Sequence, residues 1–281
     1  MSNNRAASIR ARLKLHADAI KQDFNLTLTH YGLERLLYRL SISEHKQNFL
    51  LKGALLFVLW YDIPHRPTRD ADLPGFGSDD IDSVENVFRS LCEIIVDDGI
   101  EFDPQSVKGI EIRKETGYGG VRIDLTARLD GARIVLQIDV GFGDVVTPGP
   151  ESVSYPVLLG DLPAPSLRAY PKYTVVAEKF QAVCILGITN SRMKDYFDPW
   201  VLLRDDDLDL VKLRQAIEAT LIRRQTPPLT GVPVGLSDDF VADSGKQKQW
   251  GAFLKKNKLG SIALNEVVQF LRQKFQRIGV I

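Results

Sequence analysis

The sequence predicts a mixed α+β fold, with a small mixed or antiparallel sheet in the first part of the chain and a helical C-terminal half. Apolar and polar residues alternate over 121–129 and 132–140, which is the period of a half-buried β-strand. Over 30–41, apolar residues recur at spacings of three and four, the period of an α-helix. After residue 174 only the helical period continues. Strands in one part and helices alone in the other are typical of an α+β protein.

The segment before the alternating strands is predicted to combine helices with two short strands. Leu33, Leu36 and Leu40 form the apolar face of one helix. Asp79 and Asp80 are expected to begin another, because a carboxylate can accept hydrogen bonds from the free N–H groups of the first turn. We expect helices over 5–23, 30–41, 54–60 and from 79 to about 96, and strands over 49–52 and 70–73.

The alternating segments are expected to pair as a β-hairpin. They are separated by Asp130-Gly131, a dipeptide that favours a two-residue type I′ turn. Such a turn sets the register of the two strands. Ile123 then faces Ile138 on the core side, and Arg122 faces Asp139 on the polar side.

A proline-rich stretch separates the two parts of the chain. Residues 147–173 contain six prolines and no sustained period, which predicts a loop or a domain crossover. We therefore expect an α/β core with N-terminal helices over 1–165 and a helical domain with a basic surface over 166–281. Helices of the second domain are expected over 174–187, 193–204, 208–223, 238–256 and 261–277.

Charge is distributed unevenly along the chain. The 36 basic and 36 acidic side chains cancel overall, but residues 211–281 carry 12 basic and 5 acidic side chains. This asymmetry predicts that the C-terminal part meets a polyanion while the rest holds cations. The alternative is that the C-terminal lysines form an ordinary solvated face.

Cysteine use and hydropathy predict a cytoplasmic protein without a membrane partner. Cys92 and Cys184 both lie in apolar helical patterns and are expected to be buried and reduced. The first residues are not followed by the apolar segment of a signal peptide. The longest apolar run, 54–60, is too short to span a membrane.

Two aspartates one residue apart, Asp70 and Asp72, form the first candidate site. Residues i and i+2 of a strand point to the same face, so both carboxylates would aim at one point. Mg²⁺ commonly binds one or two carboxylates together with substrate phosphates. Upstream, Gly53 lets a phosphate approach the backbone closely, and the free N–H groups of a helix start attract anions. The pattern predicts a site for a metal–nucleotide complex.

Asp139, on the returning strand of the hairpin, is the candidate third carboxylate. It would complete the metal site or help to deprotonate an attacking hydroxyl group. Because the predicted register places it opposite Arg122, a cross-strand ion pair is the second interpretation of this residue.

Four short blocks, in order and within about residues 45–205, resemble the AbiEii-type (MenT-like) nucleotidyltransferase toxins of bacterial toxin–antitoxin systems, which have a polymerase-β-type nucleotidyltransferase fold. The blocks are Leu51-Lys52-Gly53-Ala54 with Arg66-x-Thr68-x-Asp70-x-Asp72-Leu73, then Ile138-Asp139-Val140-Gly141-Phe142-Gly143-Asp144, then Glu178-Lys179-Phe180-x-Ala182-Val183, and last Arg192-x-Lys194-Asp195-x-x-Asp198. This chain departs from residues common in the family at Ala54, Leu186 and Pro199.

The resemblance implies transfer of nucleotides from an NTP to RNA, typically at the acceptor end of tRNA, which would block translation. It implies Mg²⁺ or Mn²⁺ as cofactor, tRNA or another RNA as partner, and neutralisation by a cognate antitoxin protein. Asp70, Asp72 and Asp139 would hold the metal and act in catalysis together with Lys179 and Asp195. Nucleotide-binding roles are implied for Lys52, Gly53, Ala54, Arg66, Thr68, Arg69, Arg192, Lys194 and Asp198.

Two of these positions keep a structural interpretation beside the functional one. Lys179 would place a cation on the triphosphate, but a lysine beside an apolar helix stripe can also extend outward to solvent. Asp198 would lie on one helix face with Asp195. Alternatively, it caps a helix that begins at Pro199.

The basic C-terminal segment is the candidate RNA surface, with Lys255, Lys256 and Lys258 as phosphate contacts. Trp250 and Phe253 lie among these lysines and are expected to belong to the core rather than to stack on bases. Two other functions stay open: the same metal site could serve a protein or small-molecule acceptor, or the fold could be kept by a catalytically weak binding protein.

Overall fold

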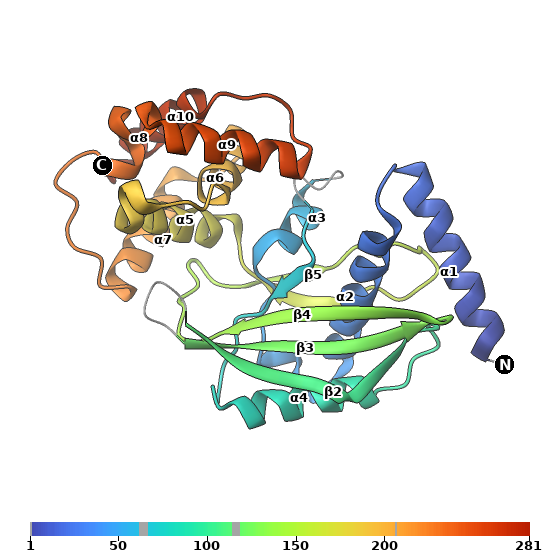
Figure 1. Cartoon of the computed structure of the whole chain (residues 1–281). Coiled ribbons are helices and arrows are strands. Elements are labelled where there is room, and N and C mark those ends of the chain that lie inside the picture. Colours follow the sequence, from blue (N-terminus) through green and yellow to red (C-terminus); the bar gives the residue numbers. More distant parts are fainter. Residues whose placement is uncertain (1, 62–66, 114–118, 206) are drawn as a thin grey trace. The chain divides into compact units, whose positions relative to one another are not determined.

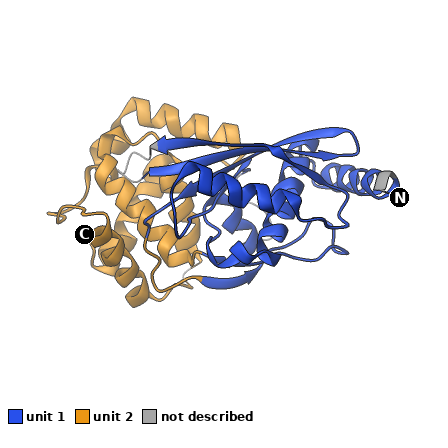
Figure 2. Cartoon of the chain, turned by 90° about the horizontal axis from the view of Figure 1, so that it is seen from below, with its two compact units in different colours: residues 1–144, 151–169 blue, residues 145–150, 170–281 orange. Residues whose placement is uncertain are grey.

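The computed structural model describes residues 2–61, 67–113, 119–205 and 207–281. The chain divides into two compact units (Figure 2). Unit 1 comprises Met1–Asp144 and Glu151–Ala169, and unit 2 comprises Val145–Pro150 and Tyr170–Ile281. The candidate residues Asp70, Asp72 and Asp139 therefore lie in unit 1, and Asp195 and Asp198 lie in unit 2.

Unit 1 is built on a four-stranded mixed sheet with the strand order β1-β4-β3-β2 (Figure 1). β1 pairs in parallel with β4, whereas β4–β3 and β3–β2 are antiparallel, as expected for a mixed sheet. The strands are β1 (Asp70–Asp72), β2 (Glu101–Arg113), β3 (Gly119–Leu129) and β4 (Ala132–Gly141), with β5 (Glu151–Ser154) and β6 (Ser166–Ala169) as a separate pair. The helices are α1 (Ser2–Ala19), α2 (Phe24–Ile42), α3 (Phe57–Trp60) and α4 (Ile81–Glu93), with 3₁₀ turns η1 (Glu44–Gln47) and η2 (Gly53–Leu56).

The predicted hairpin register is confirmed. Ile123 pairs with Ile138, and Arg122 pairs with Asp139 across β3 and β4. Ile123 and Ile138 are fully buried on the face that α2 and α4 cover. A side chain at Gly32 of α2 would press against the sheet, which shows how closely this helix packs. The opposite face of the same strands carries the polar side chains, so the hydrophobic alternation of the sequence decides where the candidate residues lie.

Four parts of the chain before residue 174 differ from the prediction. Residues 49–52 form isolated bridges instead of a strand, and 54–60 divides into the 3₁₀ turn η2 and the short helix α3. β2 was not predicted, because Pro104 interrupts it and its pairing with β3 shifts between Asp103 and Lys108. As an edge strand, β2 tolerates a proline. The expected loop over 147–173 contains β5 and β6.

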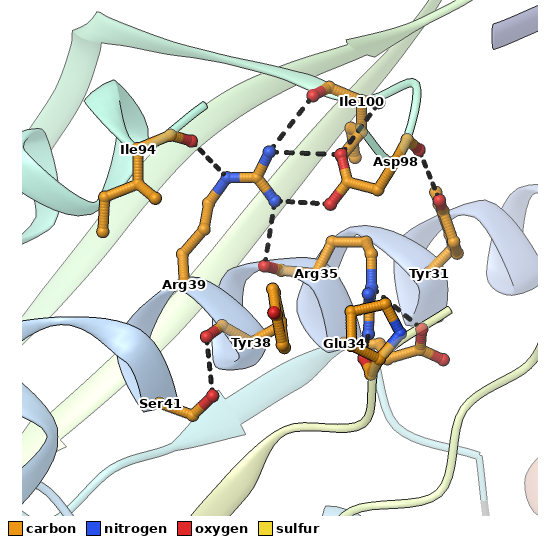
Figure 3. A network of polar contacts seen from close by, with 10 residues as sticks. Tyr31, Glu34, Arg35, Tyr38, Arg39, Ser41, Ile94, Asp98 and Ile100 are labelled. Carbon is orange, nitrogen blue, oxygen red and sulfur yellow. Dashed lines mark hydrogen bonds and ion pairs between the residues drawn. The ribbon is translucent and has the colours of Figure 1, made fainter. Parts of the chain in front are cut away.

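A buried polar network joins α2 to the start of β2 (Figure 3). Arg39 donates to both carboxylate oxygens of Asp98 at 2.7 and 3.2 Å and to the carbonyl oxygens of Ile94, Arg35 and Ile100. The side chains of Arg39 and Asp98 are 2% and 0% exposed. The Tyr31 hydroxyl group donates to the Asp98 carbonyl oxygen. Burial of such a pair is tolerated because its polar atoms find partners.

Unit 2 is helical, as the sequence predicts for the C-terminal half. Its predicted helix over 238–256 is broken at Asp243, whose carboxylate accepts from the Lys246 N–H group and begins a new helix. Pro199 lies inside a continuous helix, so the interpretation of Asp198 as a cap before it is wrong. The helices are α5 (Lys172–Leu186), α6 (Lys194–Arg204), α7 (Leu210–Arg223), α8 (Asp238–Ala242), α9 (Ser244–Asn257) and α10 (Leu264–Ile278), with 3₁₀ turns η3 (Gly187–Thr189) and η4 (Val234–Leu236). In the described part of the chain, no helix is both long and apolar enough to cross a membrane.

Candidate active site

The paired aspartates lie on β1 with the geometry that their spacing predicts. Asp70 and Asp72 are half-buried on one face of the strand, and Ala71 between them is buried on the other. The parallel pairing with β4 places Asp72 beside Asp139. The Thr68 hydroxyl group donates to Oδ1 of Asp70 and holds that carboxylate at the start of the strand.

Gly53 lies directly against the Asp72 carboxylate. The Lys52 N–H group donates to the Asp72 carbonyl oxygen at 2.9 Å, and Gly53 follows with a φ of +79°. A Cβ atom at Gly53 would clash with Oδ2 of Asp72, so both the backbone conformation and the space require glycine. Ala54 is buried in the 3₁₀ turn that follows. This 3₁₀ turn has only four residues. The predicted attraction of an anion to a helix start is therefore limited to a few backbone N–H groups.

Asp139 forms the cross-strand ion pair that was the second interpretation of this residue. Arg122 donates from Nε to Oδ1 at 2.7 Å and from Nη2 to Oδ2 at 2.9 Å. The hydrogen bond to Asp139 and the nearby carboxylates of Asp124 and Asp70 raise the pKa of Arg122. The role of Asp139 as a metal ligand stays a prediction.

Two residues of unit 1 offer oxygen ligands that suit a hard cation. Among the described residues, no three His, Cys, Asp or Glu side chains converge on a point that could hold a metal ion. Asp70 and Asp72 nevertheless present oxygen ligands from one strand face, and a magnesium ion commonly takes only one or two carboxylates from the protein. These two residues fit a metal that arrives with substrate phosphates.

The remaining predicted residues of unit 1 that the structure describes lie next to these aspartates. Lys52 Nζ donates to Asp144 Oδ2 at 2.9 Å. Arg69 is exposed beside the half-buried Thr68, whose carbonyl oxygen lies 2.7 Å from His30 Nε2. Arg66 lies outside the described residues. The contact of His30 was not predicted, because nothing local marks a histidine on α2 as a neighbour of Thr68.

In unit 2, Lys179 of α5 meets the aspartates of α6. Its Nζ atom donates to Oδ1 of Asp195 at 2.8 Å and lies 3.8 Å from Oδ2 of Asp198. The Lys179 side chain is 17% exposed, and the Asp195 side chain is fully buried. The interpretation of Lys179 as an outward-pointing surface lysine is therefore wrong. The structure brings together residues from the third and fourth sequence blocks.

Asp195 is held as a buried carboxylate by the cations around it. Burial by itself would raise its pKa, but Lys179, Arg192 and Lys194 outweigh burial, so the pKa of Asp195 lies below its ordinary value. The Nε atom of Arg192 lies 3.1 Å from Oδ2 of Asp195. Glu178 is directed elsewhere, to Arg224 at 3.2 Å. Lys179 and Asp195 thus form a charged pair at low exposure.

A second layer, which the sequence did not predict, supports Arg192. Asn190 is buried, and its Oδ1 atom accepts a hydrogen bond from the Arg192 N–H group at 2.8 Å. The carbonyl oxygen of Asn190 accepts from Nζ of Lys246 at 3.0 Å. Lys246 is buried, although it belongs to the basic segment that was expected to be a surface. No local signal distinguishes it from the exposed lysines nearby.

The three predicted RNA contacts lie at the C-terminal end of α9. Lys255 and Lys256 are exposed in its last turn, and Lys258 is exposed at its C-cap. Cations at this end also interact favourably with the helix dipole. Trp250 is 3% exposed, with its indole N–H group donating to the Ile262 carbonyl oxygen, so its expected place in the core is confirmed.

Comparison with known proteins identifies a family. The family model described as "Nucleotidyl transferase AbiEii toxin, Type IV TA system" matches residues 35–275. None of the curated proteins is similar enough to match. Among solved structures, JHP933 from Helicobacter pylori is 14% identical with a TM-score of 0.49, and 87% of each chain is covered. Another, titled "Crystal structure of putative nucleotidyltransferase from H. pylori", is 15% identical with a TM-score of 0.47, covering 87% of this chain and 90% of that one.

Proposed function

This chain belongs to the AbiEii family of nucleotidyl transferase toxins of type IV toxin–antitoxin systems, and on that premise we propose that it transfers nucleotides from an NTP to RNA. The acceptor we propose is the 3′ acceptor end of tRNA, and its modification would block translation. The family also implies a cognate antitoxin.

The contact between Gly53 and Asp72 carries the proposal. Because a Cβ atom at Gly53 would clash with the Asp72 carboxylate, the backbone of the turn and that carboxylate form one compact surface. We propose that N–H groups of this turn bind a phosphate next to the carboxylate that holds its metal ion. Such adjacency is what a metal-bound triphosphate needs.

Asp70 and Asp72 are the residues that would hold Mg²⁺ or Mn²⁺. A bound divalent ion would neutralise phosphate charge and stabilise the attacking and leaving oxygens during transfer. Thr68 orients Asp70 through its hydroxyl group. We propose that Arg69 contacts phosphate from its exposed position, and that Lys52 does so from beside Gly53.

In unit 2, we propose that Lys179 and Asp195 act as a charged pair in catalysis. Asp195 keeps the Lys179 ammonium group in place by a 2.8 Å hydrogen bond, and a positioned cation stabilises the charge that develops on a transferred phosphate. Arg192, Lys194 and Asp198 would assist in nucleotide binding. The exposed Lys255, Lys256 and Lys258 would contact RNA phosphates without reading sequence.

The test is a transfer assay with purified protein, Mg²⁺, total bacterial tRNA and each α-³²P-labelled NTP in turn. We expect label on RNA from at least one NTP, and loss of label in Asp72→Ala. Asp79→Ala is the matched control, because Asp79 is an exposed aspartate near the same strand. Label on protein or a small molecule instead of RNA would overturn the proposed acceptor. Absence of NTP binding would overturn the catalytic proposal.

A further inference from the structure

Arg122 occupies the polar face of the sheet at the row that carries the candidate metal ligands. Arg122 on β3 pairs with Asp139 on β4, and Asp139 pairs with Asp72 on β1. In this row a cationic side chain is followed by two carboxylates. The neighbouring row contains Asp70 and Gln137.

The ion pair of Arg122 engages both oxygens of Asp139. Nε binds Oδ1 at 2.7 Å and Nη2 binds Oδ2 at 2.9 Å, which is the bidentate arrangement of a strong Arg–carboxylate pair. A carboxylate held in this way is neutralised and is a poor ligand for a divalent cation. In the structure, Arg122 therefore competes with any cation for Asp139.

The hairpin does not need this ion pair for its register. Two arginines, Arg128 and Arg133, face each other at another pair of the same strands, and both are exposed. The register is set by the two-residue turn and by the buried alternate positions. The register of these strands therefore does not depend on the Arg122–Asp139 ion pair, so Arg122 could change its partner without disturbing the pairing.

The guanidinium group of Arg122 can accept a different partner. Its planar fork matches phosphate as well as it matches carboxylate. The Arg122 side chain is 33% exposed, so a ligand can reach it from solvent. The polyphosphate of a nucleotide bound at Asp70 and Asp72 would be such a ligand.

We infer that Arg122 exchanges Asp139 for the polyphosphate of the incoming metal–nucleotide complex, so that Asp139 becomes a metal ligand only when nucleotide is bound. This inference rests on the proposed function, because it takes a nucleotide as the ligand. Arg122 would then be a substrate-binding residue, and Asp139 would be a metal ligand only in the nucleotide complex. The nucleotide-free protein would then bind divalent cations weakly, through Asp70 and Asp72 alone.

Arg122→Gln should change the affinities for Mn²⁺ and for a nucleotide analogue in opposite directions. Arg122→Gln frees Asp139 and removes a positive charge, so Mn²⁺ alone should bind about tenfold more tightly. The same variant loses a charged phosphate contact, so a non-hydrolysable NTP analogue with Mn²⁺ should bind about tenfold more weakly. Mn²⁺ binding would be followed by electron paramagnetic resonance, and analogue binding by calorimetry with each of the four nucleobases. A merely structural role would weaken both.

Arg128→Gln is the control, since it removes an exposed arginine from the same strand and should change neither affinity. Arg122→Lys keeps the charge without the planar fork and should fall between the wild type and Arg122→Gln. Unchanged or weaker Mn²⁺ binding by folded Arg122→Gln would overturn the inference and leave the metal site of Asp70 and Asp72 intact. Failure of both wild type and Arg122→Gln to bind Mn²⁺ would overturn that metal site as well.

Discussion

Replacement of Asp98 by asparagine should destabilise unit 1 strongly. Asparagine keeps the size of the side chain but removes its charge, so the buried guanidinium group of Arg39 loses its counter-ion. No cavity is created, and the loss comes from the missing charge together with one acceptor oxygen that becomes an amide donor. The carbonyl oxygens that accept from Arg39 stay in place.

The expected magnitude follows from burial and from the number of contacts that survive. Removal of one partner from a buried ion pair typically costs about 3–5 kcal/mol of the free energy of unfolding. Arg39 keeps its three carbonyl acceptors, at Ile94, Arg35 and Ile100, so we expect a loss near the lower limit, about 3 kcal/mol. For a unit of this size, such a loss corresponds to roughly 6–12 °C in Tm.

Urea and thermal unfolding, followed by circular dichroism, would measure the loss, and hydrogen exchange of α2 amides would show that it arises in unit 1. Asp130→Asn is the matched control. Asp130 forms a part-exposed pair with Arg10 at 3.4 Å, and asparagine suits the turn at this position. An exposed pair contributes at most about 1 kcal/mol.

A loss in Asp98→Asn no larger than in Asp130→Asn would show that the buried ion pair stabilises unit 1 no more than an exposed one. The double variant Arg39→Met/Asp98→Leu provides a further check, because exchange of both partners for apolar residues removes the unpaired charge. It should recover a large part of the stability lost in Asp98→Asn. Equal instability of the single and double variants would show that packing, not charge, explains the effect.

Three other predictions concern the site and its surroundings. Gly53→Ala should reduce nucleotide transfer at least about 100-fold, because the new Cβ atom clashes with the Asp72 carboxylate at a positive φ. Burial raises the pKa of Glu34 to about 7, so the folded state binds a proton more tightly than the unfolded state does. The free energy of unfolding should therefore fall as the pH rises from about 5 to 8, and Glu34→Gln should lack this fall. Charge reversal at Lys255 and Lys256 should weaken RNA binding and reduce its salt slope by about 1.5, with NTP binding unchanged.

Each of these predictions has a control and an outcome that would contradict it. Gly160→Ala adds a Cβ atom in open space, so nucleotide transfer should be unaffected. Equal losses of transfer in both glycine variants would contradict the steric explanation. A pH profile of Glu34→Gln that matches the wild type would exclude Glu34 as its source. Reversal at the exposed Lys46 and Lys212 gives the same change in net charge, and an equal effect on the salt slope would remove α9 from the RNA surface.

Features that depend on neighbouring residues were predictable. The register of β3 and β4 follows from a two-residue turn and strict alternation, so the pairing of Arg122 with Asp139 was predicted correctly from local rules. The common face of Asp70 and Asp72 follows from the two-residue period of a strand. β2 escaped prediction because Pro104 is unfavourable in a strand interior, and only its place at the sheet edge makes it acceptable.

Local sequence patterns were sufficient to predict the fold class, the common strand face of Asp70 and Asp72, and the family to which the four blocks belong. Apart from Arg122 and Asp139, the partners of the buried charged residues were evident only in the tertiary structure. Lys179 turns to the buried Asp195 instead of solvent, Lys246 supports Asn190 from inside the core, and Arg39 is buried on Asp98. Periodicity shows which face of an element is apolar, but a charge finds its partner through packing between elements far apart in the chain, where desolvation makes pairing necessary.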